Sequence, residues 1–84
     1  MSTDINQRIA GIFTAKADAL SHKGERFRYR AMAYRRAANA LNKLDHGVDE
    51  IYARSWLKGL QKIEGIGNRL AHDIENELKK ISKK

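Results

Sequence analysis

The chain has 84 residues, enough for one domain, and its 17 Lys and Arg against 10 Asp and Glu give a formal net charge of +7. The absence of cysteine excludes a disulfide framework and a cysteine-type zinc site. No apolar run approaches the ~20 residues needed to cross a bilayer, and the N-terminus lacks a signal-peptide pattern. We therefore expect a soluble intracellular protein whose basic surface attracts polyanions, nucleic acid above all.

The first half of the chain predicts two helices. Asp4 or Thr3 can cap a first helix, which turn-prone residues 21–24 end. A second helix is expected from about Glu25 to Lys43. Its apolar stripe comprises Phe27, Ala31, Tyr34, Ala38 and Leu41, and that of the first helix comprises Ile5, Ile9, Ile12, Phe13 and Leu20. The second helix is rich in arginine, a residue that favours bidentate contact with phosphate. The alternative is that its basic face is simply solvated.

The second half predicts a short third helix and a helical hairpin. The third helix opens at Val48 or Asp49, and the hairpin occupies about residues 56–81. We expect Trp56 in the core, because a small domain needs its largest side chain to fill that core. The alternative is that Trp56 and Leu57 are exposed for contact with a partner. Without any β-alternation, the fold class is all-α: a single domain over residues 1–84, built as a compact bundle of four to five short helices.

A Gly-Ile-Gly sequence joins the two helices of the hairpin. Gly65 and Gly67 flank Ile66, and glycine allows a sharp turn and close approach because it has no Cβ. The first amides of the following helix, at Asn68 and Arg69, lack intrahelical partners and lie at the positive end of the helix dipole. These features favour a phosphate site, and an ordinary turn between packed helices is the alternative.

The pattern resembles the helix-hairpin-helix motif, and the chain from residue 5 to 81 is similar to the N-terminal domain of the DNA polymerase beta (X) family. The resemblance implies a pocket for a DNA 5′-phosphate formed by Arg30, Tyr34 and Arg69. It also implies a monovalent cation, Na⁺ or K⁺, on the main-chain carbonyls of Gln61, Ile63 and Ile66. The matching blocks are Ile9-Ala10-x-Ile12-Phe13, Lys23-Gly24-Glu25-x-Phe27-Arg28-x-Arg30-Ala31, Tyr34-Arg35-Arg36-Ala37-Ala38 and Gly65-Ile66-Gly67-x-x-x-Ala71-x-x-Ile74.

Some members of that family are lyases that use a lysine in the last helix to form a Schiff base. The corresponding residue here is Asp73, and a carboxylate cannot form an imine. Lys62, on the other side of the turn, is the candidate surrogate. The 84 residues also contain no counterpart of the family's nucleotidyl-transfer domain. We therefore expect no enzyme activity, with a 5′-deoxyribose-phosphate lyase acting through Lys62 as the alternative.

The sequence thus predicts a non-catalytic module that grips the DNA backbone with little base preference. Duplex or gapped DNA is the expected partner, in the cytoplasm, nucleoid or nucleus. A membrane, a small-molecule substrate and a required cofactor are not expected, and helix-hairpin-helix self-association is an alternative that we do not expect. The predicted contact residues are Gly65, Ile66, Gly67, Asn68, Arg69, Arg28, Arg30, Tyr34 and Arg35.

Overall fold

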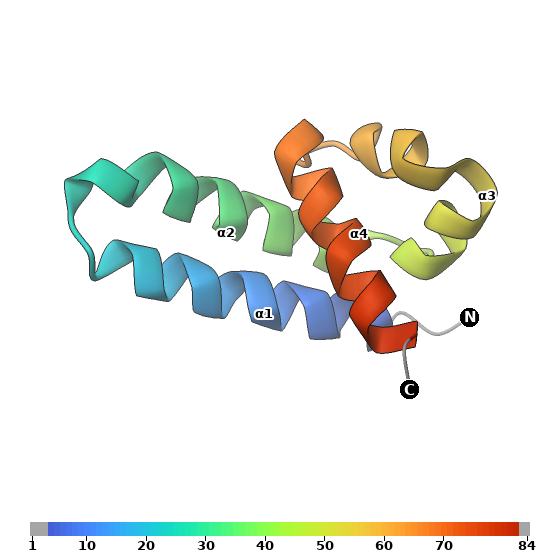
Figure 1. Ribbon diagram of the computed structural model, residues 1–84, viewed down its shortest axis with the longest axis horizontal. Coiled ribbons are helices and arrows are strands. Elements are labelled where there is room, and N and C mark those ends of the chain that lie inside the picture. The colour runs from blue at the N-terminus through green and yellow to red at the C-terminus, as the bar shows by residue number, and fades with distance from the viewer. Residues whose placement is uncertain (1–3, 83–84) are drawn as a thin grey trace.

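The computed structural model describes residues 4–82, and within this range every regular element is helical (Figure 1). The all-α prediction is confirmed. Thr3 and the outermost residues of the predicted 1–84 domain lie outside the described residues. In chain order the elements are α1 (Asp4–Ser21), the 3-10 turn η1 (Glu25–Phe27), α2 (Arg28–Lys43), α3 (Val48–Gln61) and α4 (Asn68–Ser82).

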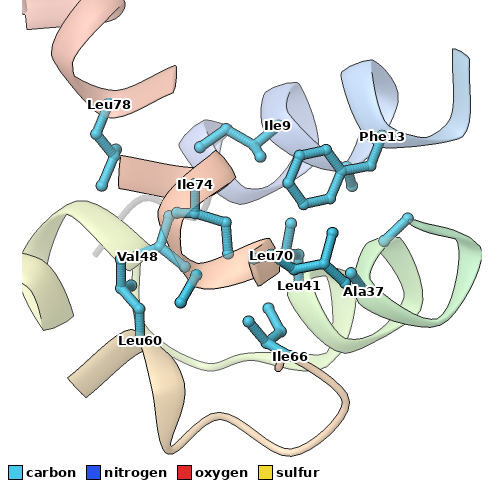
Figure 2. Packing of buried hydrophobic residues seen from close by; sticks show 13 residues of the cluster. Ile9, Phe13, Ala37, Leu41, Val48, Leu60, Ile66, Leu70, Ile74 and Leu78 are labelled. Atoms are coloured by element: carbon cyan, nitrogen blue, oxygen red, sulfur yellow. The ribbon is translucent and has the colours of Figure 1, made fainter. Parts of the chain in front are cut away.

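The helices α1 and α2 form a long antiparallel pair, and α3 and α4 gather at the end where α1 begins and α2 ends (Figure 1). Most residues of the predicted apolar stripes belong to the core cluster at this junction, but Leu20, Phe27 and Ala31 do not. Ile9 and Phe13 of α1 are fully buried, as are Leu41 of α2 and Ile74 of α4 (Figure 2). Each such side chain contributes about 1.5–3 kcal/mol through burial. The core therefore holds the hairpin firmly against the α1–α2 pair.

One buried polar residue fixes the entry to α3. Asn6 lies on α1 with no exposed surface; its side-chain oxygen accepts a hydrogen bond from the Val48 amide at 2.8 Å, and its amide nitrogen donates to the His46 carbonyl at 2.8 Å. The first contact satisfies an orphan amide at the start of a helix, as a capping residue does, but from 42 positions away. Asn6 thereby ties the loop before α3 to α1.

The helix α3 is interrupted at Trp56. The backbone there has φ 57° and ψ −149°, in a region that is essentially restricted to glycine and costs other residues about 1–3 kcal/mol. The range Val48–Gln61 therefore consists of two short helical segments, as predicted for the third helix and the first hairpin helix. The expectation that Trp56 is a core residue is wrong: 68% of it is exposed, because the interruption turns it out of the apolar stripe. Its ring and the Tyr52 ring meet edge to face, with centroids 5.6 Å apart.

Candidate nucleic-acid interface

The turn between α3 and α4 is held by its own main chain and by the core. The Ile63 amide donates to the Leu60 carbonyl at 3.2 Å, and the Ile66 amide donates to the Ile63 carbonyl at 3.0 Å. The Gln61 side chain donates to the side-chain oxygen of Asn68, which joins the end of α3 to the start of α4. The Ile66 side chain is buried in the core. The turn is therefore a pre-formed platform.

The two glycines of the turn have different physical roles. Gly65 has a φ of +91°, and a Cβ built there would lie 3.2 Å from the Ala40 Cβ of α2. Its missing side chain thus serves the turn conformation and the close packing of the hairpin on α2. A Cβ at Gly67 would meet no atom within 4 Å. Gly67 lies on the exposed side of the turn, where a ligand can approach the main chain.

The start of α4 presents unpaired amides. The Ala71 amide makes the first hydrogen bond of the helix, to the Gly67 carbonyl at 2.9 Å. Within residues 4–82, the amides of Gly67, Asn68 and Arg69 have no hydrogen-bond acceptor. Such donors, at the positive end of a 15-residue helix, are suited to an anionic oxygen.

A pocket of about 540 Å³ opens between α2 and the hairpin turn. It brings together most of the predicted contact residues, namely Arg30, Tyr34, Gly65, Ile66, Gly67, Asn68 and Arg69. It also includes Arg36, which lies in one of the matching blocks but is not among the predicted contact residues. The signal was present: Arg36 falls at helical spacing between Ala33 and Ala40, the small residues that permit close approach of the hairpin. Three arginines therefore line one pocket.

Tyr34 lies at the wall of this pocket with its hydroxyl already engaged. The hydroxyl donates to the Asp73 carboxylate at 2.9 Å, so Asp73 faces α2 and not the solvent side of α4. Burial raises the pKa of Tyr34, and the hydrogen bond and charge of Asp73 raise it further, whereas the Arg30 and Arg69 guanidiniums act in the opposite direction. Tyr34 is half-buried, which fits its place in the predicted apolar stripe. The free donors at the pocket are thus the guanidiniums and the amides.

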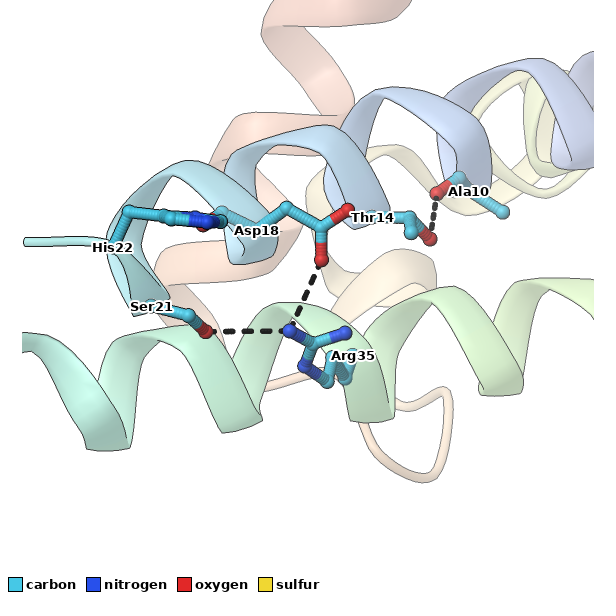
Figure 3. Close-up of polar contacts among 6 residues, drawn as sticks. All are labelled: Ala10, Thr14, Asp18, Ser21, His22 and Arg35. Atoms are coloured by element: carbon cyan, nitrogen blue, oxygen red, sulfur yellow. Dashed lines mark hydrogen bonds and ion pairs between the residues drawn. The ribbon is translucent and has the colours of Figure 1, made fainter.

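Arg28 and Arg35 lie away from the hairpin pocket, on another hollow of about 480 Å³ that also contains Glu25. The Arg35 guanidinium donates to the Asp18 carboxylate at 3.1 Å and to the Ser21 hydroxyl at 3.2 Å (Figure 3). It therefore joins α2 to the end of α1. The structure does not bring these two arginines to the turn, and their contact with DNA stays a prediction.

The carbonyls implied as cation ligands belong to the turn and to the end of α3. The Ile63 carbonyl accepts the Ile66 amide, which leaves one lone pair, and those of Gln61 and Ile66 accept no hydrogen bond within the described residues. Oxygen ligands of this kind suit a hard cation. The donor chemistry therefore fits Na⁺ or K⁺. In the described part of the chain, no cluster of His, Asp and Glu could hold a metal ion.

Comparison with known protein families agrees with the helical hairpin seen in the structure. A family model described as a helix-hairpin-helix domain matches residues 4–82, which is nearly the whole chain. No curated protein and no solved structure matches it. None of the helices in the described range is long and apolar enough to span a membrane. The finer relationship, to the polymerase beta family, stays a prediction.

Proposed function

This chain belongs to the helix-hairpin-helix domain family, and we propose that it is a non-catalytic module that binds the DNA backbone with little dependence on base sequence. Domains of this family commonly bind DNA. The observation that carries the proposal is the pocket in which Arg30, Arg36 and Arg69 surround the bare start of α4. Both features recognise phosphate, and neither reads a base.

In the proposed complex, the amides of Gly67, Asn68 and Arg69 donate to phosphate oxygens of one strand. The guanidiniums of Arg30 and Arg36 approach the same strand from α2, each able to form two parallel hydrogen bonds. Either an internal phosphodiester or a 5′-phosphate at a gap or nick supplies the required oxygens. A cation on the turn carbonyls would add positive charge beside the same strand.

The position of Asp73 supports a non-catalytic role. Asp73 accepts the Tyr34 hydroxyl and offers no amine to an abasic sugar. The surrogate candidate, Lys62, follows the end of α3 and does not line the pocket. A lyase would therefore need its nucleophile to act from outside the pocket that holds the phosphate. Borohydride trapping on an incised abasic duplex is expected to give no covalent adduct, and a trapped adduct would establish the lyase.

The salt dependence of binding tests the proposal. If about five phosphates are neutralised, log K falls against log salt with a slope of about −4 to −5 on duplex DNA. The slope is measured by fluorescence anisotropy on duplexes of equal length and unrelated sequence, and the slope and affinity should be the same for each. A slope near zero at low salt, or a strong preference for one sequence, would reject backbone binding. A 5′-phosphorylated gapped duplex in the same series identifies the preferred DNA structure.

A second candidate function, protein association, is favoured by one observation. Trp56 is exposed, and the backbone conformation that exposes it is energetically costly. An exposed tryptophan is typical of the anchor residues of protein interfaces. Leu57 beside it is only partly exposed. Under this candidate, sedimentation would reveal a dimer that Trp56→Ala converts to a monomer. Under backbone binding, both proteins sediment as monomers in the absence of DNA.

A further inference from the structure

A further basic hollow, distinct from that of Arg28 and Arg35, adjoins the hairpin pocket and lies between α1 and α2. Its volume is about 270 Å³, and its charged lining residues are Lys16, Lys23 and Arg30, without any carboxylate. Arg30 and Tyr34 line both this hollow and the hairpin pocket. The two sites are therefore contiguous, separated by a wall formed by these two side chains.

We propose that this hollow is a second phosphate site, occupied by a further phosphodiester of the strand that the hairpin grips. The inference rests on the proposed function and adds the path of the strand to it. From the turn, the strand crosses Tyr34 and Arg30 and continues toward the junction between α1 and η1. A polymer with regularly spaced negative charges matches two contiguous cationic hollows, whereas a single small anion would fill only one.

The charges of the hollow are largely available. The Lys16 ammonium lies 4.0 Å from a Glu77 carboxylate oxygen, but Lys80 shares the same oxygen at 3.6 Å. One carboxylate therefore faces two lysines and does not neutralise both. The Lys23 ammonium lies over the Phe27 ring, 5.7 Å from its centroid, and has no carboxylate partner among the described residues. The hollow thus keeps a positive charge.

The wall between the two sites is rigid. The Tyr34 ring contacts Phe13 edge to face, with centroids 5.2 Å apart, and the hydroxyl is fixed by Asp73. Phe13 is fully buried, so the ring is anchored to the core. The Lys16 ammonium lies 5.7 Å from the centroid of the same ring. A strand that leaves the hairpin pocket over this wall meets Lys16 next.

A matched pair of double variants tests the inference. Lys16→Gln with Lys23→Gln removes two charges from the hollow, and Lys43→Gln with Lys58→Gln removes two charges from exposed lysines that line neither this hollow nor the hairpin pocket. On a gapped duplex, the first variant should flatten the salt slope by about 1 and weaken binding about 10-fold, because one phosphate contact is lost. The second should leave the slope unchanged. Equal effects of the two variants, or no effect of the first, would overturn the inference.

Folding and the proposed function are controlled separately. Circular dichroism shows whether the double variant is destabilised. Lys23→Gln alone leaves the Lys16–Glu77 contact intact, so its effect on binding can be interpreted even if the double variant is destabilised. The variant Arg30→Gln with Arg69→Gln reports on the hairpin pocket. If it weakens binding while the variants of Lys16 and Lys23 match the Lys43 and Lys58 control, the inference fails and the proposed function stands. If the unaltered protein shows no salt-dependent binding, the proposed function fails first.

Discussion

Arginines on two sides of α2 have different surroundings, although they belong to one helix and one basic stretch. Arg30 and Arg36 face a pocket completed by the unpaired amides of α4. Arg35 faces the end of α1, where a carboxylate and a hydroxyl already accept its hydrogen bonds. The number of arginines is therefore a poor guide to function. The element against which each side of the helix packs decides whether a guanidinium is available to a ligand.

The largest expected effect on DNA affinity comes from removing arginine charges at the hairpin pocket, compared with removing them from the other side of α2. Arg30→Gln with Arg69→Gln should weaken DNA binding by at least about 100-fold, since each removes a charge-assisted hydrogen bond of about 1.5–3 kcal/mol and about 1.4 kcal/mol is a factor of ten. Arg28→Gln with Arg35→Gln removes the same charge and should weaken binding less than about 3-fold, because only long-range attraction is lost. Anisotropy titrations at one salt concentration compare them. Similar losses for both would mean that the two sides of α2 do not differ in function.

The two glycines of the turn should differ in stability. Gly65→Ala places a side chain at a φ of +91° and 3.2 Å from Ala40, and should lower the free energy of unfolding by about 1–3 kcal/mol. Gly67→Ala meets open space and should change the free energy by less than about 0.5 kcal/mol. Urea denaturation followed by circular dichroism measures both. A loss at Gly67 as large as that at Gly65 would show that Gly67 also serves packing.

Removal of the Tyr34 hydroxyl should affect stability more than binding. Tyr34→Phe deletes the hydrogen bond to Asp73 and should cost about 1 kcal/mol of unfolding free energy. DNA affinity should change less than about 2-fold, because the hydroxyl donates to Asp73 and not to phosphate. The same denaturation and anisotropy assays apply. A large loss of affinity in a stably folded variant would show that the hydroxyl turns to the DNA.

The smallest effect is a loss of stability at alkaline pH. Burial and Asp73 raise the pKa of Tyr34 above 10.0, so the folded state favours the neutral phenol. The resulting stabilisation is fully present below pH 10 and is lost as the pH rises through the folded-state pKa. The pKa of Tyr52 is also raised, chiefly by its hydrogen bond to Glu75 at 2.6 Å. Urea denaturation across this range should show a steeper decline for the unaltered protein than for Tyr34→Phe; parallel curves would contradict the assignment.

Much of the fold was predictable because it depends on periodicity. The spacing of Ile9 and Phe13 in α1 and of Leu70, Ile74 and Leu78 in α4 fits one buried helical face, and the structure buries those residues. The Gly-Ile-Gly sequence likewise indicated the hairpin. Sequence spacing specifies which residues share a face of a helix. That information was sufficient for the helices and for the position of the turn.

Features that depend on contacts between elements were not predictable. Trp56 was expected in the core because of its size, but the backbone interruption that exposes it has no glycine or proline to signal it. Asn6 caps a helix 42 residues away, so no local motif reveals it. Arg35 and Arg36 are adjacent in sequence and indistinguishable by type. Only the packing of α1 on one side and the hairpin on the other separates their roles.

The amide NMR signals of the turn test the central claim most directly. On titration with a short duplex, the signals of Gly67, Asn68 and Arg69 should shift strongly and saturably, while those around Arg28 and Arg35 shift little. This result would place phosphate at the start of α4. Unmoved turn signals in a folded protein that still binds DNA, with shifts concentrated around Arg28 and Arg35, would contradict the account.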